Sequence, residues 1–209
     1  MTQPQIIAYF PEWTGYTAAD LQRAGSAARL TIINYAFGIP APDPDTGQVV
    51  CTVEDPQAAY GRAYGADESV DGVPDSPGQP LRGHFNQLRK LKALYPNLRI
   101  VASLGGWTGS TWFSDAASTA EARERFAASC IDLFIKGNLP ELGGAGGPGA
   151  GEGVFDGLDI DWEFPVTGGL ESTHRRPDDA ANFVLLLEEF RRQYAALRRD
   201  GLLLTAAIP

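Results

Sequence analysis

The sequence predicts an α/β fold in which strands and helices alternate around a parallel sheet, and two observations lead to this prediction. Five short apolar runs rich in β-branched or aromatic residues recur along the chain, with polar turn residues and helical patterns between them. No glycine-rich phosphate loop follows the first run, where the sequence reads YFPEWTGY, and this disfavours a doubly wound nucleotide-binding fold. Five successive βα units therefore favour a barrel of the (β/α)8 kind.

The predicted elements follow one another in a regular order. The predicted strands cover residues 6–10, 30–37, 99–106, 154–164 and 201–209. The predicted helices cover residues 18–24, 84–95, 119–137 and 178–200. Leu88, Leu91 and Leu94 recur at the spacing of one helix face, and Phe183 and Phe190 belong to a similar series in the last helix.

Two segments interrupt this alternation. Residues from about 40 to 80 are dense in Pro, Gly, Asp and Ala, so we expect a long insertion above the sheet after the second strand. Residues 138–153 are rich in glycine and are expected to be flexible, but the next strand continues the same pattern. We therefore expect residues 1–209 to form a single domain. A closed barrel needs eight strands, so the expected fold is a TIM-type (β/α)8 barrel truncated after the fifth strand.

Composition and charge disfavour several classes of function. The formal net charge of −9 and the sequence pI of about 4.7 disfavour nucleic acids and anionic membranes as partners, because both are polyanionic. No run of about 18 apolar residues is present, so no membrane span is expected. The amino-terminal sequence MTQPQIIAYF lacks a basic leader, and no signal peptide is visible in it. A neutral substrate fits this charge balance best.

The chain contains two cysteines, Cys51 and Cys130. They are too far apart for a metal knuckle and lack the CxxC spacing of a redox pair. They can form one structural disulfide or remain two buried thiols, because free cysteine is among the most buried residue types. The sequence leaves both interpretations open.

The fourth predicted strand carries carboxylates at alternate positions. Asp159, Asp161 and Glu163 share one face of that strand, with about 7 Å between neighbours, and we expect them to form a column pointing into the barrel. Trp162 falls on the opposite face, against the helices. Three like charges in an apolar setting resist joint ionisation, so at least one proton should be held along the column at neutral pH. Glu163 lies nearest the carboxyl end of the strand, where barrel active sites lie, and is the predicted acid.

Two other interpretations of this strand stay open. Its carboxylates can be buried structural groups that Lys, Arg or backbone donors satisfy, since each buried charge needs compensation. They can also be ligands for a hard cation. We prefer the catalytic interpretation and expect neither a metal site nor a cofactor.

The residues of this strand resemble a known family. FDGLDIDWEFP is similar to the DxxDxDxE signature of glycoside hydrolase family 18, the chitinases, with Asp156, Asp159, Asp161 and Glu163 at its fixed positions. INYAFG, SLGGWT and LLTAAIP resemble the second, third and fifth strands of the same family, and the long insertion resembles that of secreted bacterial chitinases. The resemblance spans the whole chain and implies the first five βα units of a chitinase barrel.

The resemblance also implies an activity, which is substrate-assisted, retaining hydrolysis of β-1,4-N-acetylglucosamine linkages in chitin. Glu163 would protonate the glycosidic oxygen, and the N-acetyl carbonyl of the substrate would attack the anomeric carbon. Asp161 would turn to stabilise the resulting oxazolinium while Asp159 shares its proton, and Glu163 would then act as a base toward water. No cofactor is required. The implied partner is chitin or a chitooligosaccharide, and the implied location is extracellular.

Aromatic and small residues near the predicted strand ends complete the candidate site. Flat rings pack on the apolar faces of sugars, and the candidates for this role are Tyr9, Phe37, Trp107 and, in the first loop, Trp13. A strand aromatic can equally well serve in core packing. Small residues at the end of the third strand are expected to leave room for the carboxylates, and they are Ser103, Gly105 and Gly106.

The chain departs from full members of the family. Their sixth strand carries a Met-x-Tyr-Asp type motif that holds the N-acetyl group, and their eighth strand carries a Trp under the reacting sugar. Neither segment is in this sequence. Open sheet edges need cover, so we expect self-association or a missing C-terminal half. Three other functions stay open, namely a non-catalytic chitin-binding lectin, an inactive barrel fragment and an endo-N-acetylglucosaminidase.

Overall fold

The computed structural model describes residues 4–208, so Pro209 of the fifth predicted strand lies outside the described residues. The strands are β1 (Ile7–Pro11), β2 (Ile32–Pro42), β3 (Val49–Val53), β4 (Arg99–Gly105), β5 (Leu139–Leu142), β6 (Ala145–Gly147), β7 (Gly157–Asp161) and β8 (Leu203–Ala206). The α-helices are α1 (Ala18–Arg23), α2 (Gly83–Leu94), α3 (Gly106–Gly109), α4 (Phe113–Ala117), α5 (Ala120–Cys130) and α6 (Asp179–Ala196). Three short turns of other helix types are η1 (Glu12–Thr14), η2 (Gln57–Gly61) and η3 (Ile131–Ile135).

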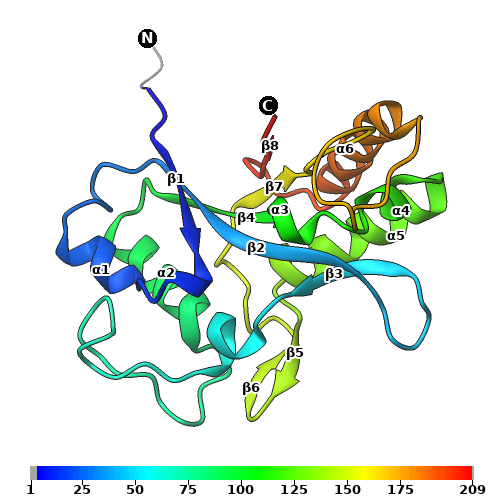
Figure 1. Ribbon diagram of the computed structural model, residues 1–209. Coiled ribbons are helices and arrows are strands. Elements are labelled where there is room, and N and C mark those ends of the chain that lie inside the picture. Colours follow the sequence, from blue (N-terminus) through cyan, green and yellow to red (C-terminus); the bar gives the residue numbers. More distant parts are fainter. Residues whose placement is uncertain (1–3, 209) are drawn as a thin grey trace.

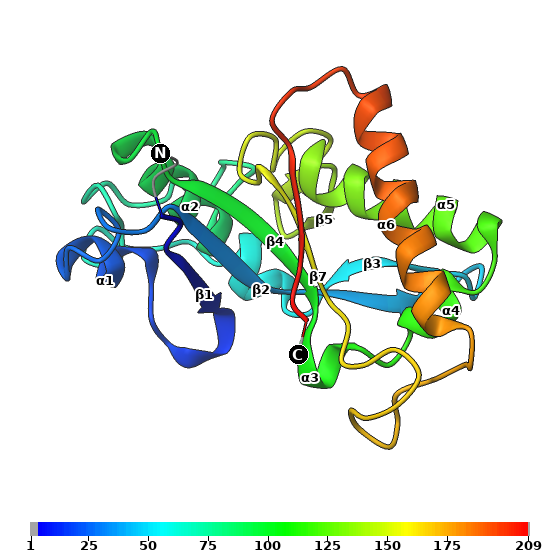
Figure 2. The ribbon, with the colours of Figure 1, turned by 90° about the horizontal axis from the view of Figure 1, so that it is seen from above.

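The main sheet is mostly parallel, as the sequence predicts. Its parallel strands lie in the order β1-β2-β4-β7-β8, and these are the five predicted strands. The register aligns Ser103 of β4 with Asp159 of β7 and Thr205 of β8. Figure 1 shows α1 and α2 at one end of the molecule and α4, α5 and α6 at the other, and Figure 2 shows the strands between them.

Helix starts and core packing follow ordinary local rules. Thr17 and Asp20 form a capping box at the start of α1, which satisfies backbone N–H groups that the helix cannot. Behind the sheet, edge-to-face rings fill the core, with 4.9 Å between the ring centroids of Phe85 and Phe155 and 5.3 Å between those of Phe134 and Phe155. No helix within residues 4–208 is both long enough and apolar enough to cross a membrane.

The segment after the second predicted strand differs from expectation. β2 does not end near Phe37 but continues to Pro42, and its far half pairs antiparallel with β3, with Pro40 opposite Cys51. The first half of β2 has β1 and β4 as parallel partners. The far half extends past β1, where β3 supplies new backbone partners. The expected insertion at about 40–80 therefore begins inside a strand and adds one strand to the sheet.

The glycine-rich segment was expected to be flexible, and the structure shows an ordered hairpin there. β5 and β6 pair antiparallel, and the Gly146 N–H donates to the Pro80 carbonyl at 2.7 Å. A Cβ on Gly146 would lie 2.1 Å from the Pro140 carbonyl oxygen, and its φ is +87°. Only glycine fits such a position. At this position glycine is needed because two backbone segments lie in close contact, and the glycine content does not make the segment flexible.

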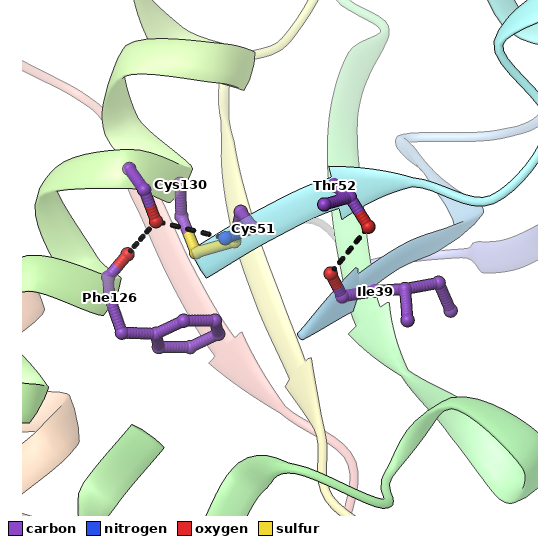
Figure 3. Close-up of a disulfide and its surroundings, with 6 residues drawn as sticks. Ile39, Cys51, Thr52, Phe126 and Cys130 are labelled. Atoms are coloured by element: carbon purple, nitrogen blue, oxygen red, sulfur yellow. Dashed lines mark hydrogen bonds between the residues drawn. A yellow bond between two sulfur atoms is a disulfide. The ribbon is translucent and has the colours of Figure 1, made fainter. Parts of the chain in front are cut away.

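Cys51 of β3 and Cys130 at the end of α5 form a disulfide, with 4.9 Å between their Cα atoms (Figure 3). The backbone N–H of Cys51 also donates to the Ser129 hydroxyl at 2.9 Å. Because the two cysteines are 79 residues apart in sequence, the bond closes a long loop of the unfolded chain. It fixes β3 against a helix of the main fold.

The double substitution Cys51→Ser, Cys130→Ser should lower the free energy of unfolding by about 2–5 kcal/mol, because the unfolded chain regains the freedom that the bond removes. Urea denaturation of both proteins without reductant measures the change. Dithiothreitol should lower the denaturation midpoint of the original chain and leave that of the double variant in place. Equal midpoints for the two oxidised proteins would contradict the expected role of the disulfide.

Candidate active site

Asp159 is the centre of a hydrogen-bond network that involves every parallel strand. Its side chain is 2% exposed in the middle of β7. Oδ2 accepts hydrogen bonds from the Ser103 hydroxyl at 2.9 Å and from Asn34 Nδ2 and the Tyr9 hydroxyl at 3.2 Å each. Oδ1 accepts from the Thr205 hydroxyl at 2.6 Å. Four donors therefore satisfy this buried carboxylate, one from each of β1, β2, β4 and β8.

Asp161 is buried at the carboxyl end of β7, two residues after Asp159. Burial, together with the negative charges of Glu163 and Asp159, raises the pKa of its carboxyl from 3.8 to about 6. Burial also raises the pKa of the Tyr9 hydroxyl to about 12, with Asp159 and Asp161 contributing. Tyr9 thus stays protonated at neutral pH and remains a donor to Asp159.

Glu163 follows the end of β7 and is partly exposed. Its backbone N–H donates to the Ser110 hydroxyl at 2.9 Å. That hydroxyl is fully buried and lies 2.8 Å from the Gly106 carbonyl and 3.1 Å from the Asp161 carbonyl. Ser110 therefore ties the backbone that carries Glu163 to the end of β4. Sequence reasoning missed this serine, and its place two residues after the SLGGWT motif was the available signal.

Asp156 belongs to the same motif but lies at the other end of β7. Its Oδ2 lies 2.9 Å from Lys92 Nζ, its Oδ1 lies 3.6 Å from Arg99 Nε, and the Ile100 N–H donates to Oδ2 at 2.9 Å. These contacts join the amino-terminal ends of β4 and β7. For this one carboxylate, the structure agrees with the alternative in which Lys, Arg and backbone donors satisfy the charge.

The glycines at the end of β4 lie where no side chain fits. Gly105 has a φ of +106°, and a Cβ there would lie 2.5 Å from the Asp161 carbonyl oxygen and from the Phe113 ring. A Cβ on Gly106, at φ +74°, would lie 2.5 Å from the Phe37 ring. Because these two glycines have no side chain, the end of β4 can lie close to the end of β7 and to the Phe37 ring.

The candidate aromatic residues gather at the mouth of the sheet. The rings of Trp13 and Phe37 stack with 5.8 Å between centroids, and Tyr9 lies 6.3 Å from Phe37. Trp13 is 63% exposed and Trp107 is 50% exposed. A cavity of about 570 Å³ opens here, lined by Glu12, Trp13, Phe37, Glu54, Asp55, Ala58, Trp107 and Thr108. The structure thus brings Trp13, Phe37 and Trp107 to one cavity.

Trp162 lies on the opposite face of the strand from the carboxylates. It is 2% exposed and packs against Phe113 of α4 and Phe183 of α6, with 5.4 and 5.7 Å between ring centroids. This residue is therefore part of the core. Across residues 4–208, no group of three or more His, Cys, Asp or Glu side chains is arranged to hold a metal ion.

Comparison with known proteins identifies the family to which the chain belongs. Residues 5–209 match the family described as glycosyl hydrolases family 18. The chain belongs to this family. Chitinase C of Streptomyces lividans is 41% identical over 204 residues, and chitinase 63 of Streptomyces plicatus is 39% identical over 204 residues. Each alignment covers 93% of this chain and 30% of the relative, so this family 18 chain spans about a third of their length.

Solved structures of the family show the same fold. The catalytic domain of psychrophilic chitinase B from Arthrobacter TAD20 superposes with a TM-score of 0.90 at 42% identity, and covers 97% of this chain and 51% of its own. Chitinase ChiA74 from Bacillus thuringiensis superposes with a TM-score of 0.73 at 27% identity, covering 98% of this chain and 35% of its own. This family 18 chain therefore spans about half or less of these structures.

The substitution Asp161→Asn should change how stability depends on pH. The pKa of Asp161 is raised in the folded state, so the native protein keeps a proton that the unfolded chain releases between about pH 4 and 6. The stability of the original protein should therefore fall across this window relative to the variant, which cannot ionise. Melting temperatures of both proteins from pH 4 to 8 test this, and a constant difference between them would contradict the raised pKa.

Proposed function

We propose that this chain carries the proton donor of a chitinase, which hydrolyses β-1,4-N-acetylglucosamine linkages by a substrate-assisted, retaining mechanism. The observation that carries the proposal is the arrangement of three carboxylates along β7. They run from the fully bonded Asp159, through the buried Asp161 with its raised pKa, to the partly exposed Glu163 at the mouth. Membership of glycosyl hydrolases family 18 supports the same reaction.

Each carboxylate has a distinct role in this proposal. Glu163 donates a proton to the glycosidic oxygen and later accepts one from the incoming water. The N-acetyl carbonyl of the substrate attacks the anomeric carbon, and Asp161 stabilises the positively charged oxazolinium that results. Asp159, whose oxygens are held by four donors, shares the proton of Asp161 and keeps its place in the column. All of these steps use side chains and substrate atoms.

The cavity that contains the candidate aromatic residues suits a sugar chain. Trp13 and Phe37 present stacked rings, and Trp107 adds a half-exposed ring to the same cavity. Flat rings of this kind pack on the apolar faces of pyranoses. We therefore propose that these residues bind N-acetylglucosamine units, with chitin or a chitooligosaccharide as the partner.

We also propose that the five parallel strands are the first part of a (β/α)8 barrel, in which β3 and the segment after it form an insertion. The strand order β1-β2-β4-β7-β8 supports this, with β1 and β8 as the outermost parallel strands. Ile7 on β1 and Val184 on α6 are about half exposed, and this supports the proposal that further structure covers these surfaces. Either a C-terminal half or a second copy of the chain would do so. The disulfide supports an extracellular location, because such bonds persist in oxidising compartments.

The substitution Glu163→Gln should lower turnover by about 10²–10⁴-fold, because the amide cannot donate the proton that the leaving oxygen requires. Release of a fluorescent leaving group from chitobiose and chitotriose glycosides measures this. Asp156→Asn is a matched control, since this carboxylate lies at the other end of the same strand and bonds to Lys92 and Arg99. It should lower stability and leave turnover within a few-fold.

Circular dichroism would first establish that all three proteins fold. Equal turnover by the original chain and the Glu163→Gln variant would contradict the role of Glu163. Absence of turnover from the folded original chain would contradict the idea that these strands suffice for catalysis. Binding of chitooligosaccharides by such a chain would then identify it as a sugar-binding unit.

A further inference from the structure

Glu12 is a buried carboxyl that the mechanism proposed above does not use. It follows β1 directly, precedes Trp13 in the sequence and is only 8% exposed. Glu12 lines two cavities. One is the cavity of about 570 Å³ that contains Trp13 and Phe37, and the other is a polar cavity of about 280 Å³ that contains Tyr64 and His84. A buried carboxylic acid needs specific partners, so its position calls for an explanation.

Groups on three separate elements surround Glu12. The Tyr35 hydroxyl, fully buried on β2, donates a hydrogen bond to Glu12 Oε2. Asp55, which follows β3, lines both cavities together with Glu12, and His84 of α2 lines the smaller one. The hydroxyl of Tyr64, in the same smaller cavity, lies 3.1 Å from His84 Nδ1. The turn after β1 is thus bonded to β2 and bordered by the segment after β3 and by α2.

These contacts act on the aromatic floor of the larger cavity. Glu12 is the residue before Trp13, and Tyr35 lies two residues before Phe37 on β2. The hydrogen bond between Glu12 and Tyr35 therefore joins the two backbone segments whose rings stack at 5.8 Å, with 24° between their planes. Without that bond, the short η1 turn would have fewer constraints to hold the Trp13 ring over Phe37.

We propose that Glu12 is a positioning residue that fixes Trp13 on Phe37 and thereby sets the affinity for oligosaccharides long enough to reach Trp13. The proposal rests on the proposed function for the identity of the ligand. The other part of the proposal, that Glu12 restricts the motion of the Trp13 ring, does not depend on any ligand. Glu12 touches neither the carboxylate column nor, in this proposal, the bond that is cleaved.

The buried and negatively charged surroundings of Glu12 make its protonation, and with it the stability of the protein, depend on pH near neutrality. Burial raises the pKa of its carboxyl from 4.5 to about 7, and Glu54 and Asp55 contribute in the same direction, while the Tyr35 hydrogen bond opposes the shift. The titratable and charged groups that face Glu12 or share its cavities are Tyr16, Tyr35, Glu54, Asp55, Arg62, Tyr64, Glu68 and His84. Because burial also lowers the pKa of His84 to about 4, its ring is neutral where Glu12 titrates.

The first test needs no sugar. In a Trp107→Phe, Trp112→Phe background, the remaining indoles are the exposed Trp13 and the buried Trp162, and time-resolved fluorescence anisotropy reports the local motion of Trp13. Glu12→Ala and Tyr35→Phe should each increase the fast depolarising component. Glu54→Ala is the matched control, because this carboxylate lines the same cavity but is exposed, and it should leave the component unchanged. Unchanged motion in the folded Glu12→Ala and Tyr35→Phe variants would overturn the proposal.

The second test uses chitohexaose and chitobiose with proteins that carry Glu163→Gln, so that binding is measured without turnover. Glu12→Ala should weaken chitohexaose binding by up to about tenfold, the order expected for loss of one aromatic stack, and leave chitobiose binding unchanged. Adding Trp13→Ala to Glu12→Ala should cause little further loss, because both changes remove the same contact. Additive losses, or equal weakening for both sugars, would overturn the positioning role.

The two tests separate the inference from the proposed function. If Glu12→Ala mobilises Trp13 but the original chain binds no chitooligosaccharide, the positioning role stands and the sugar ligand is wrong. If the chain binds chitohexaose and Glu12→Ala changes neither Trp13 motion nor affinity, the ligand stands and the positioning role is overturned.

Titration of Glu12 has its own readout. Since the pKa of Glu12 is raised in the fold, the stability it contributes is present below about pH 4.5 and is lost as the pH rises through about 7. The melting temperature of the Glu12→Gln variant should therefore rise relative to that of the original chain between pH 5 and 8. A difference that stays flat over this range would show that Glu12 does not titrate there and would overturn the pH dependence.

Discussion

The carboxylate of Asp159 is the interaction on which the rest of the structure depends. A buried ionised group is costly unless hydrogen bonds replace its lost hydration. Here each of the other four parallel strands supplies one donor, so the bonds of Asp159 require β1, β2, β4, β7 and β8 to be in register together. Slipping one strand by a residue would turn its donor to the other face. The same atoms that satisfy the charge therefore specify how the sheet is assembled.

The satisfaction of Asp159 sets the properties of the next carboxylate in the column. Because donors hold both oxygens of Asp159 in place, its negative charge stays fixed beneath Asp161. Asp161 lies between this charge and that of Glu163 in a buried setting, which is why its pKa is raised. Hydrogen-bond donors are thus concentrated at the bottom of the column, and the carboxyl of Asp161 above them has a raised pKa. A carboxyl of this kind suits a site that must hold and release a proton near neutral pH.

Strand and site positions could be predicted where local pattern decides them. The alternation of Asp159, Asp161 and Glu163 fixes a shared face because strand geometry has a period of two. The same rule does not show that Lys92 and Arg99 meet Asp156 at the amino-terminal end of the strand. The hydrogen-bond partners of Asp159, such as Asn34 and Thr205, lie on other strands. They can be identified only once the register of the strands is known, because the sequence next to each residue contains no sign of the partner. The ordered hairpin at residues 138–153 was missed because glycine content indicates freedom but not close packing.

The segment after β2 connects helix α5 to the cavity that contains Trp13. The disulfide and the Ser129 hydrogen bond hold β3 on α5, which packs among the helices behind the sheet. β3 leads directly into Glu54 and Asp55, which line the cavity together with Glu12 and Trp13. The disulfide and β3 therefore connect α5 to the segment that borders the aromatic residues of the cavity. Because a covalent bond holds β3 to α5 and backbone pairing holds it to β2, the part of the lining that faces Trp13 keeps its place.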